Sequence, residues 1–174
     1  MTKKVQNFKS LDSLKSVEKV IKEAELALKD KNRLIINSSI RGVLGAALGS
    51  VVGGGISFTA IYYRGEVGVS GPGIMTGLTS LGRLVGGGAL EGIFVAAVPV
   101  AAGAVLGYAA LNRQKNKKYQ EASRKLDSIQ DQLEREVDSP KERIEYLNSL
   151  IILLSRAVEE LKEDLATATK PSFS

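Results

Sequence analysis

The chain has 174 residues and a formal net charge of +5, and it contains no cysteine, histidine or tryptophan. The absence of cysteine and histidine excludes disulfide frameworks, thiolate or imidazole metal sites, cysteine nucleophiles and histidine-based catalytic triads. Hydrophobic residues make up 44% of the chain, which is too many for a disordered protein.

The charges divide the chain into three zones. Residues 1–41 carry a net charge of +5, residues 42–111 contain only four charged side chains, and residues 112–174 carry twelve of each sign. All 18 glycines lie in the middle zone. We therefore expect three segments with different structures: a basic helix, a glycine-rich membrane domain and a charged helical region.

Residues 1–41 are predicted to form a basic amphipathic helix on the cytoplasmic side. Ser10 or Ser13 is expected to cap its N-terminus. The positive charge favours anionic lipid headgroups over nucleic acid, because aromatic residues are not interleaved with the basic ones. The predicted apolar stripe has spacings of three and four: Leu14, Val17, Ile21, Ala24 and Leu28.

The middle zone contains two uncharged stretches, residues 42–63 and residues 92–111. About 20 apolar residues in a helix cross a bilayer, so both are predicted to be membrane-spanning helices. A third candidate helix, Pro72 to Leu90, would lie in the interface, re-enter the membrane or cross it. The alternative is a buried helical hairpin, which glycine disfavours by roughly 1 kcal/mol per residue relative to alanine.

Basic residues flank the two predicted spans, and by the positive-inside rule both chain termini face the cytoplasm. The residues that carry this prediction precede the first span or follow the second: Lys29, Lys31, Arg33, Arg41, Arg113, Lys115, Lys117 and Lys118.

Glycines recur every four residues in the middle zone, a spacing that allows close helix packing in lipid. We expect them to mediate association of several copies; the alternative is packing of the two spans within one chain. The predicted helix-packing residues are Gly45, Gly49, Gly53, Gly82, Gly86, Gly103 and Gly107.

A stripe of polar residues accompanies these glycines. Thr76, Ser80 and Arg83, with Glu91 and Glu66 nearby, would line a polar passage in an oligomer, because charge at membrane depth requires pairing or water. The alternative is an interfacial helix whose Arg83 reaches the headgroups.

The third zone is predicted to form two helices broken at Ser139–Pro140. The paired carboxylates at positions 159–160 and 163–164 are expected on a solvated face. Bundling within the chain, an intermolecular coiled coil and recruitment of a protein partner all remain open. The second helix has an a/d pattern over three heptads: Ile144, Leu147, Ile151, Leu154, Val158, Leu161 and Leu165.

The run GEVGVSGPGIMTGLTSLG at residues 65–82, followed by Val85-Gly-Gly-Gly and an alanine-rich apolar stretch, resembles a known pattern. It is similar to the glycine-rich core of the interferon-inducible 6-16 family and of related bacterial small membrane proteins, over residues 40–111. The resemblance implies a small membrane protein of the kind linked to immunity or cell death.

The expected fold is therefore all-α, with two transmembrane helices, an intervening re-entrant or interfacial helix and a cytoplasmic bundle or coiled coil. The leading functional hypothesis is an oligomeric membrane protein that permeabilises or gates a bilayer, such as a toxin or defence effector. The alternative is a non-conducting membrane scaffold that recruits a partner through its coiled-coil helices. No catalytic constellation, cofactor or metal site is expected.

Overall fold

The computed structural model describes residues 6–50, 56–66 and 105–168. Every regular element within them is a helix, so the all-α prediction is confirmed for this part of the chain. The elements, in order, are α1 (Leu11–Lys29), the short 3₁₀ helix η1 (Ile35–Asn37), α2 (Arg41–Ser50), α3 (Phe58–Glu66), α4 (Val105–Arg135) and α5 (Lys141–Ala168).

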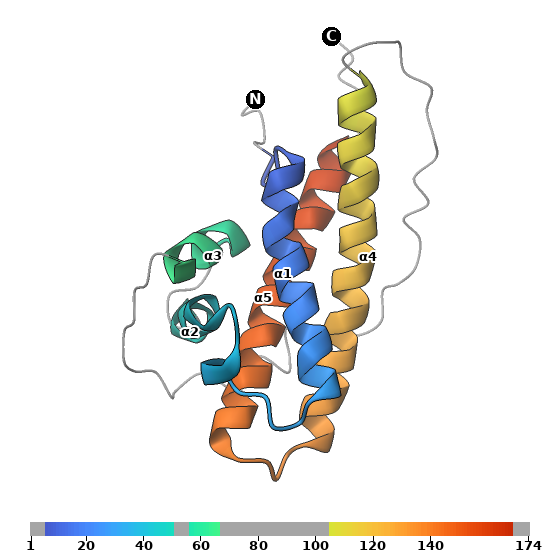
Figure 1. The fold of residues 1–174 in the computed structure, drawn as a ribbon. Coiled ribbons are helices and arrows are strands. Elements are labelled where there is room, and N and C mark those ends of the chain that lie inside the picture. Colours follow the sequence, from blue (N-terminus) through green and yellow to red (C-terminus); the bar gives the residue numbers. More distant parts are fainter. Residues whose placement is uncertain (1–5, 51–55, 67–104, 169–174) are drawn as a thin grey trace.

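Three long helices, α1, α4 and α5, lie side by side and form a bundle, as Figure 1 shows. α1 and α4 run in the same direction and α5 runs opposite to both. The start of the bundle is marked by the Gln6 amide, which donates to the Tyr108 hydroxyl at 3.1 Å. Further along, an ion pair of 3.4 Å joins Glu25 of α1 to Lys125 of α4. α1 and α4, which are distant in sequence, therefore lie side by side along their length.

Helix α1 forms where the apolar spacing predicts it. Ser10 is its N-cap, and Ser10 and Ser13 form a reciprocal capping box in which each hydroxyl accepts from the other residue's backbone N–H. The predicted stripe faces the core: Leu14, Val17, Ile21 and Ala24 are buried, and Leu28 packs partly buried against them. The amphipathic helix covers the predicted stripe, but it ends at Lys29 and does not continue to residue 41.

The predicted break between the last two helices is also confirmed. Helix α4 ends at Arg135 and α5 begins at Lys141, one residue after Pro140. The Pro140 carbonyl accepts from the backbone N–H of Arg143 at 2.9 Å. Proline suits this place because its missing N–H belongs to the donors that a helix start leaves unpaired.

The middle of α5 is buried on all sides. Nine successive residues, 146–154, are buried, because α1 and α4 cover one side of the helix and α2 covers another. A helix that is apolar around its whole circumference belongs in the interior of a protein. α5 is therefore the central helix of the fold. It is not a coiled-coil helix that buries only one face.

The interval 42–63, predicted as one spanning helix, is not a single helix. α2 ends at Ser50, α3 begins at Phe58, and residues 56–57 are not helical. Three successive glycines at 53–55 disfavour helix continuation by roughly 1 kcal/mol each. The Ser57 hydroxyl then accepts from the Ala60 N–H at 3.2 Å, which is the geometry of a new helix start.

Helices α2 and α3 pack on each other and against α5, beside the three-helix bundle (Figure 1). No helix in the described residues is both long and apolar enough to cross a membrane. Residues 105–111 of the second predicted span begin α4, and the rest of that span and the Pro72–Leu90 helix lie outside the described residues. The buried apolar residues of the docked pair are Val43, Leu44, Ala47, Phe58, Ile61 and Tyr62.

Candidate functional site

Three of the predicted helix-packing glycines lie in the described residues. Gly45, Gly49 and Gly107 are each placed so that an added Cβ atom would meet no heavy atom within 4 Å. In this form of the chain, these three glycines therefore have open space at their Cβ positions. The remaining predicted residues lie outside the described residues. They are the other helix-packing glycines, Gly53, Gly82, Gly86 and Gly103, and the residues of the predicted polar passage, Thr76, Ser80, Arg83 and Glu91.

The basic flank after the second predicted span is not wholly at the surface. Lys115, one of the basic residues expected to flank the second span on the cytoplasmic side, is fully buried, and its ammonium group lies 2.8 Å from Asp164 Oδ2. Burial of a lysine requires such a partner, because an isolated ammonium group in the interior loses its hydration without compensation. Lys115 is thus a structural cation that joins α4 to α5.

Two of the four carboxylates expected on a solvated face of α5 are buried. Glu159 and Glu163 are exposed as predicted, but Glu160 is 7% exposed and Asp164 is 2% exposed. Asp164 also accepts hydrogen bonds from the backbone N–H groups of Asn7 at 2.7 Å and Phe8 at 2.9 Å. With Lys115, Asp164 holds three donors from two other segments.

Glu160 lies one turn before Asp164 and holds helix α3. Its Oε1 atom accepts from the backbone N–H of Phe58, the first residue of α3, at 2.5 Å. Its other oxygen, Oε2, is buried and has no hydrogen-bond partner among the described residues. Burial raises the pKa of Glu160, and the nearby carboxylate of Asp164 raises it further, whereas the Phe58 N–H opposes the shift.

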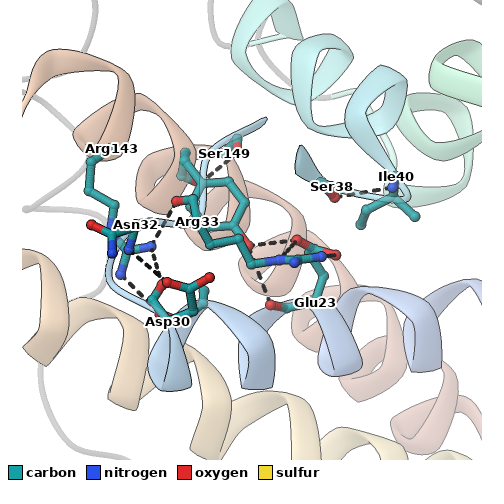
Figure 2. Close-up of polar contacts among 10 residues, drawn as sticks. Glu23, Asp30, Asn32, Arg33, Ser38, Ile40, Arg143 and Ser149 are labelled. Carbon is teal, nitrogen blue, oxygen red and sulfur yellow. Dashed lines mark hydrogen bonds and ion pairs between the residues drawn. The ribbon is translucent and has the colours of Figure 1, made fainter. Parts of the chain in front are cut away.

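The opposite end of the bundle is organised by Arg143, near the start of α5. This guanidinium group is buried and pairs with Glu136 through two nitrogens, at 2.7 and 3.3 Å. Its remaining N–H groups donate to the backbone carbonyls of Ala27 at 2.9 Å, Asp30 at 3.3 Å and Arg33 at 3.0 Å. Figure 2 shows Arg143 reaching toward the segment that follows α1. One side chain therefore ties three segments together.

A second ion pair lies beside this arginine, between Glu23 and Arg33 (Figure 2). Arg33 binds the carboxylate through two nitrogens, at 2.7 and 3.1 Å, and the Tyr146 hydroxyl donates to the same carboxylate at 2.6 Å. Burial alone would raise the pKa of Glu23, but these hydrogen bonds outweigh it and hold the pKa below its ordinary value. Burial and the Glu23 carboxylate raise the pKa of Tyr146, which stays a neutral donor.

The heptad positions of α5 are occupied within the chain. Leu147, Leu154 and Leu161 are fully buried, and α5 packs chiefly against α4, α2 and α1. Bundling within one chain, one of the alternatives open from the sequence, is therefore what the structure contains. Of the seven predicted heptad residues, Ile144 and Val158 are only partly buried.

No three carboxylates in residues 6–50, 56–66 and 105–168 come together to hold a metal ion. The buried charged groups of the described residues are paired or hydrogen-bonded across elements, and Glu160 is the one among them with an oxygen that lacks a hydrogen-bond partner in this part of the chain. The contact of α3 with the last turns of α5 is therefore the candidate functional site.

Comparison with models of protein families, with curated proteins and with solved structures found no match to this chain. The resemblance of residues 40–111 to the glycine-rich core of the interferon-inducible 6-16 family therefore stays a prediction.

Proposed function

We propose that the chain is an oligomeric membrane protein that permeabilises or gates a bilayer, and that its helical bundle holds α2 and α3 before insertion. The observation that carries this proposal is the docking of α2 and α3, the first part of the glycine-rich zone, on α5 through apolar side chains. Such docking covers apolar surface that otherwise favours lipid.

The composition of the rest of this zone supports the same function. Residues 67–104 contain only two charged side chains, Arg83 and Glu91, and many of the glycines. In lipid, helices associate through close backbone approach at small residues rather than through hydrophobic burial. The open faces of Gly45 and Gly49 on α2 are free for such contacts between copies.

The packing of the bundle supports the proposed orientation. α1 precedes the glycine-rich zone and α4 and α5 follow it, and the three helices form one bundle. Both flanks of the zone therefore belong on the same side of a membrane, which we propose is the cytoplasmic side. Inserted residues 42–63 and 92–111 would form the two spans, because lipid tolerates glycine-rich helices that water disfavours.

Dye release from anionic liposomes tests this function. The purified full-length chain should release the dye, and Gly45→Leu/Gly49→Leu should lose most of the release and the oligomer detected by cross-linking in the vesicles. Folding should be unaffected, because both positions have open space beside them. Ala109→Leu/Ala110→Leu is the matched control, since these exposed α4 residues lie outside the glycine run.

Two outcomes would contradict the proposal. Vesicles that contain inserted protein but keep their dye would favour a non-conducting membrane scaffold instead. Equal release by the glycine variant and its control would show that the glycine faces do not mediate assembly.

A further inference from the structure

The last turns of α5 hold both flanks of the glycine-rich zone. Glu160 binds the first residue of α3, before the zone's central part, and Asp164 binds Lys115 of α4, after it. The two carboxylates are four residues apart and so lie on the same face of the helix. A change at this face therefore acts directly on α3 or on α4.

The two carboxylates differ in how well they are satisfied. Asp164 accepts three hydrogen bonds, one of them from a buried ammonium group. Glu160 accepts one, and its Oε2 is buried without a partner in the described residues. A buried carboxylate without compensation is strongly disfavoured, whereas its protonated form is tolerated and still accepts at the other oxygen. The docked state of α3 therefore favours neutral Glu160.

The cations near this face do not replace the missing partner. From α4, Lys115 is bound to Asp164. From α1, Lys19 is exposed and its ammonium group lies 5.9 Å from the centroid of the Tyr62 ring. The one charged residue of α2 is Arg41, which is exposed at the first residue of the helix.

The charged groups that act on the pKa of Glu160 are acidic. On α5 itself, Glu159, Glu163 and Asp164 surround Glu160 and, after burial, are the causes that raise its pKa. The residues that α2 and α3 bury around this contact are apolar or aromatic. Against these groups, the hydrogen bond from the Phe58 N–H lowers the pKa of Glu160.

We propose that Glu160 is a proton-controlled latch, whose neutral form holds α3 on α5 and whose ionisation releases α3 from the bundle. α2 packs on α3 and moves with it. The docked form binds the proton more tightly than the released form, so docking strengthens as pH falls and weakens as pH rises through the raised pKa. Asp164, which is fully paired, keeps α4 and the N-terminal segment in place. The latch goes beyond the proposed membrane function and does not depend on it.

Amide hydrogen exchange of the full-length chain without lipid tests the latch. Protection factors, which are corrected for the intrinsic effect of pH on exchange, should fall in α3 by up to about tenfold per pH unit above the ordinary range of a glutamate. Protection in α1 should stay flat over that range and serves as the internal reference. Glu160→Gln, which keeps an acceptor for Phe58, should give high and pH-independent protection in α3.

Glu159→Gln is the matched control, because this exposed neighbour lies on the same turn and should leave the α3 response unchanged. A flat α3 response in the unmodified chain, or the same response in Glu160→Gln, would overturn the latch. Parallel changes in α1 and α3 would also overturn it, since they would report global stability.

A second measurement does not depend on these variants. The chain has no tryptophan, so Tyr62→Trp places a single reporter at a buried position of α3 and Tyr63→Trp places one at an exposed position. Acrylamide quenching of the first should increase as pH rises, and quenching of the second should not; equal responses would contradict the latch. Because both experiments omit lipid, their failure is distinct from a failure of dye release.

Discussion

The two ends of the bundle handle buried charge in different ways. At the end formed by the α4–α5 connection, Arg143 and Arg33 form bidentate pairs with Glu136 and Glu23, and Arg143 also donates to several backbone carbonyls. At the other end, Asp164 is equally well satisfied but Glu160 is not. Complete pairing fixes the first end, whereas the incomplete pairing of one carboxylate makes the docking of α3 depend on its charge.

The largest effect is expected from Arg143→Ala. It leaves Glu136 buried without its cation and removes donors from three carbonyls, so the free energy of unfolding should fall by about 5 kcal/mol, the upper end for breaking a buried pair. Urea unfolding followed by circular dichroism measures this.

Two controls sharpen the prediction for Arg143. Arg143→Lys should recover little, because an ammonium group cannot reproduce the planar set of donors. Arg156→Ala removes a more exposed arginine paired with Glu159 and should change stability by no more than about 1 kcal/mol. Equal losses of unfolding free energy in Arg143→Ala and Arg156→Ala would mean that the buried Arg143 network stabilises the fold no more than a surface ion pair does.

A somewhat smaller loss, about 3 kcal/mol, is expected from Asp164→Asn, because the amide oxygen still accepts hydrogen bonds while Lys115 loses its counter-charge. Adding Lys115→Met should recover part of the loss, since the unpaired buried charge is then absent. Unfolding curves of the two single variants and the double variant give the coupling. Additive losses would show that the two groups act independently.

Acid should affect the two ends in opposite directions. Burial raises the pKa values of Glu136 and Glu23, but Arg143 and Arg33 outweigh it and hold both values below that of an ordinary glutamate. The two carboxylates therefore stabilise the fold above the ordinary glutamate pKa, and this stabilisation is lost as pH falls through the lowered pKa values. The pKa of Glu160 is raised, so docking of α3 improves over the same fall. Hydrogen exchange of each end at several acidic pH values should show protection falling at the first end while that of α3 holds or rises. A fall of both together would remove the contrast.

The smallest effect is a gain. Gly49→Ala should stabilise α2 by up to about 1 kcal/mol, because alanine is the better helix former and the added methyl group meets open space. Exchange protection in α2 measures the change. A loss of protection would mean that the glycine face is already in contact with another copy of the chain in solution.

The helices of the bundle could be predicted because their signals are local. Each signal acts within a few residues: the spacing of Leu14, Val17 and Ile21, and the proline at position 140. In the structure the three apolar residues are buried on one helix, and a helix begins directly after Pro140. The break between α2 and α3 also had a local signal, three glycines followed by Ser57, which a search for uncharged stretches overlooks.

The pairing of buried charges could not be predicted in this way. Lys115 and Asp164 are 49 residues apart, and Phe58 and Glu160 are 102 apart, so their contacts depend on how the helices pack. One signal for the burial was present: residues 150–154 are all apolar and cover the whole circumference of α5, which requires neighbours on every side. The open glycine faces, in contrast, leave their proposed use in assembly to experiment.

The central place of α5 also bears on how the chain is made. Synthesis proceeds from the N-terminus, at about 5 to 20 residues per second, so α2 and α3 leave the ribosome several seconds before the helix that covers them. During that interval their apolar side chains have no partner from α5. The apolar faces of α2 and α3 in a nascent chain therefore stay uncovered by α5 until translation is nearly complete, so the rate of translation sets how long they are exposed to other partners.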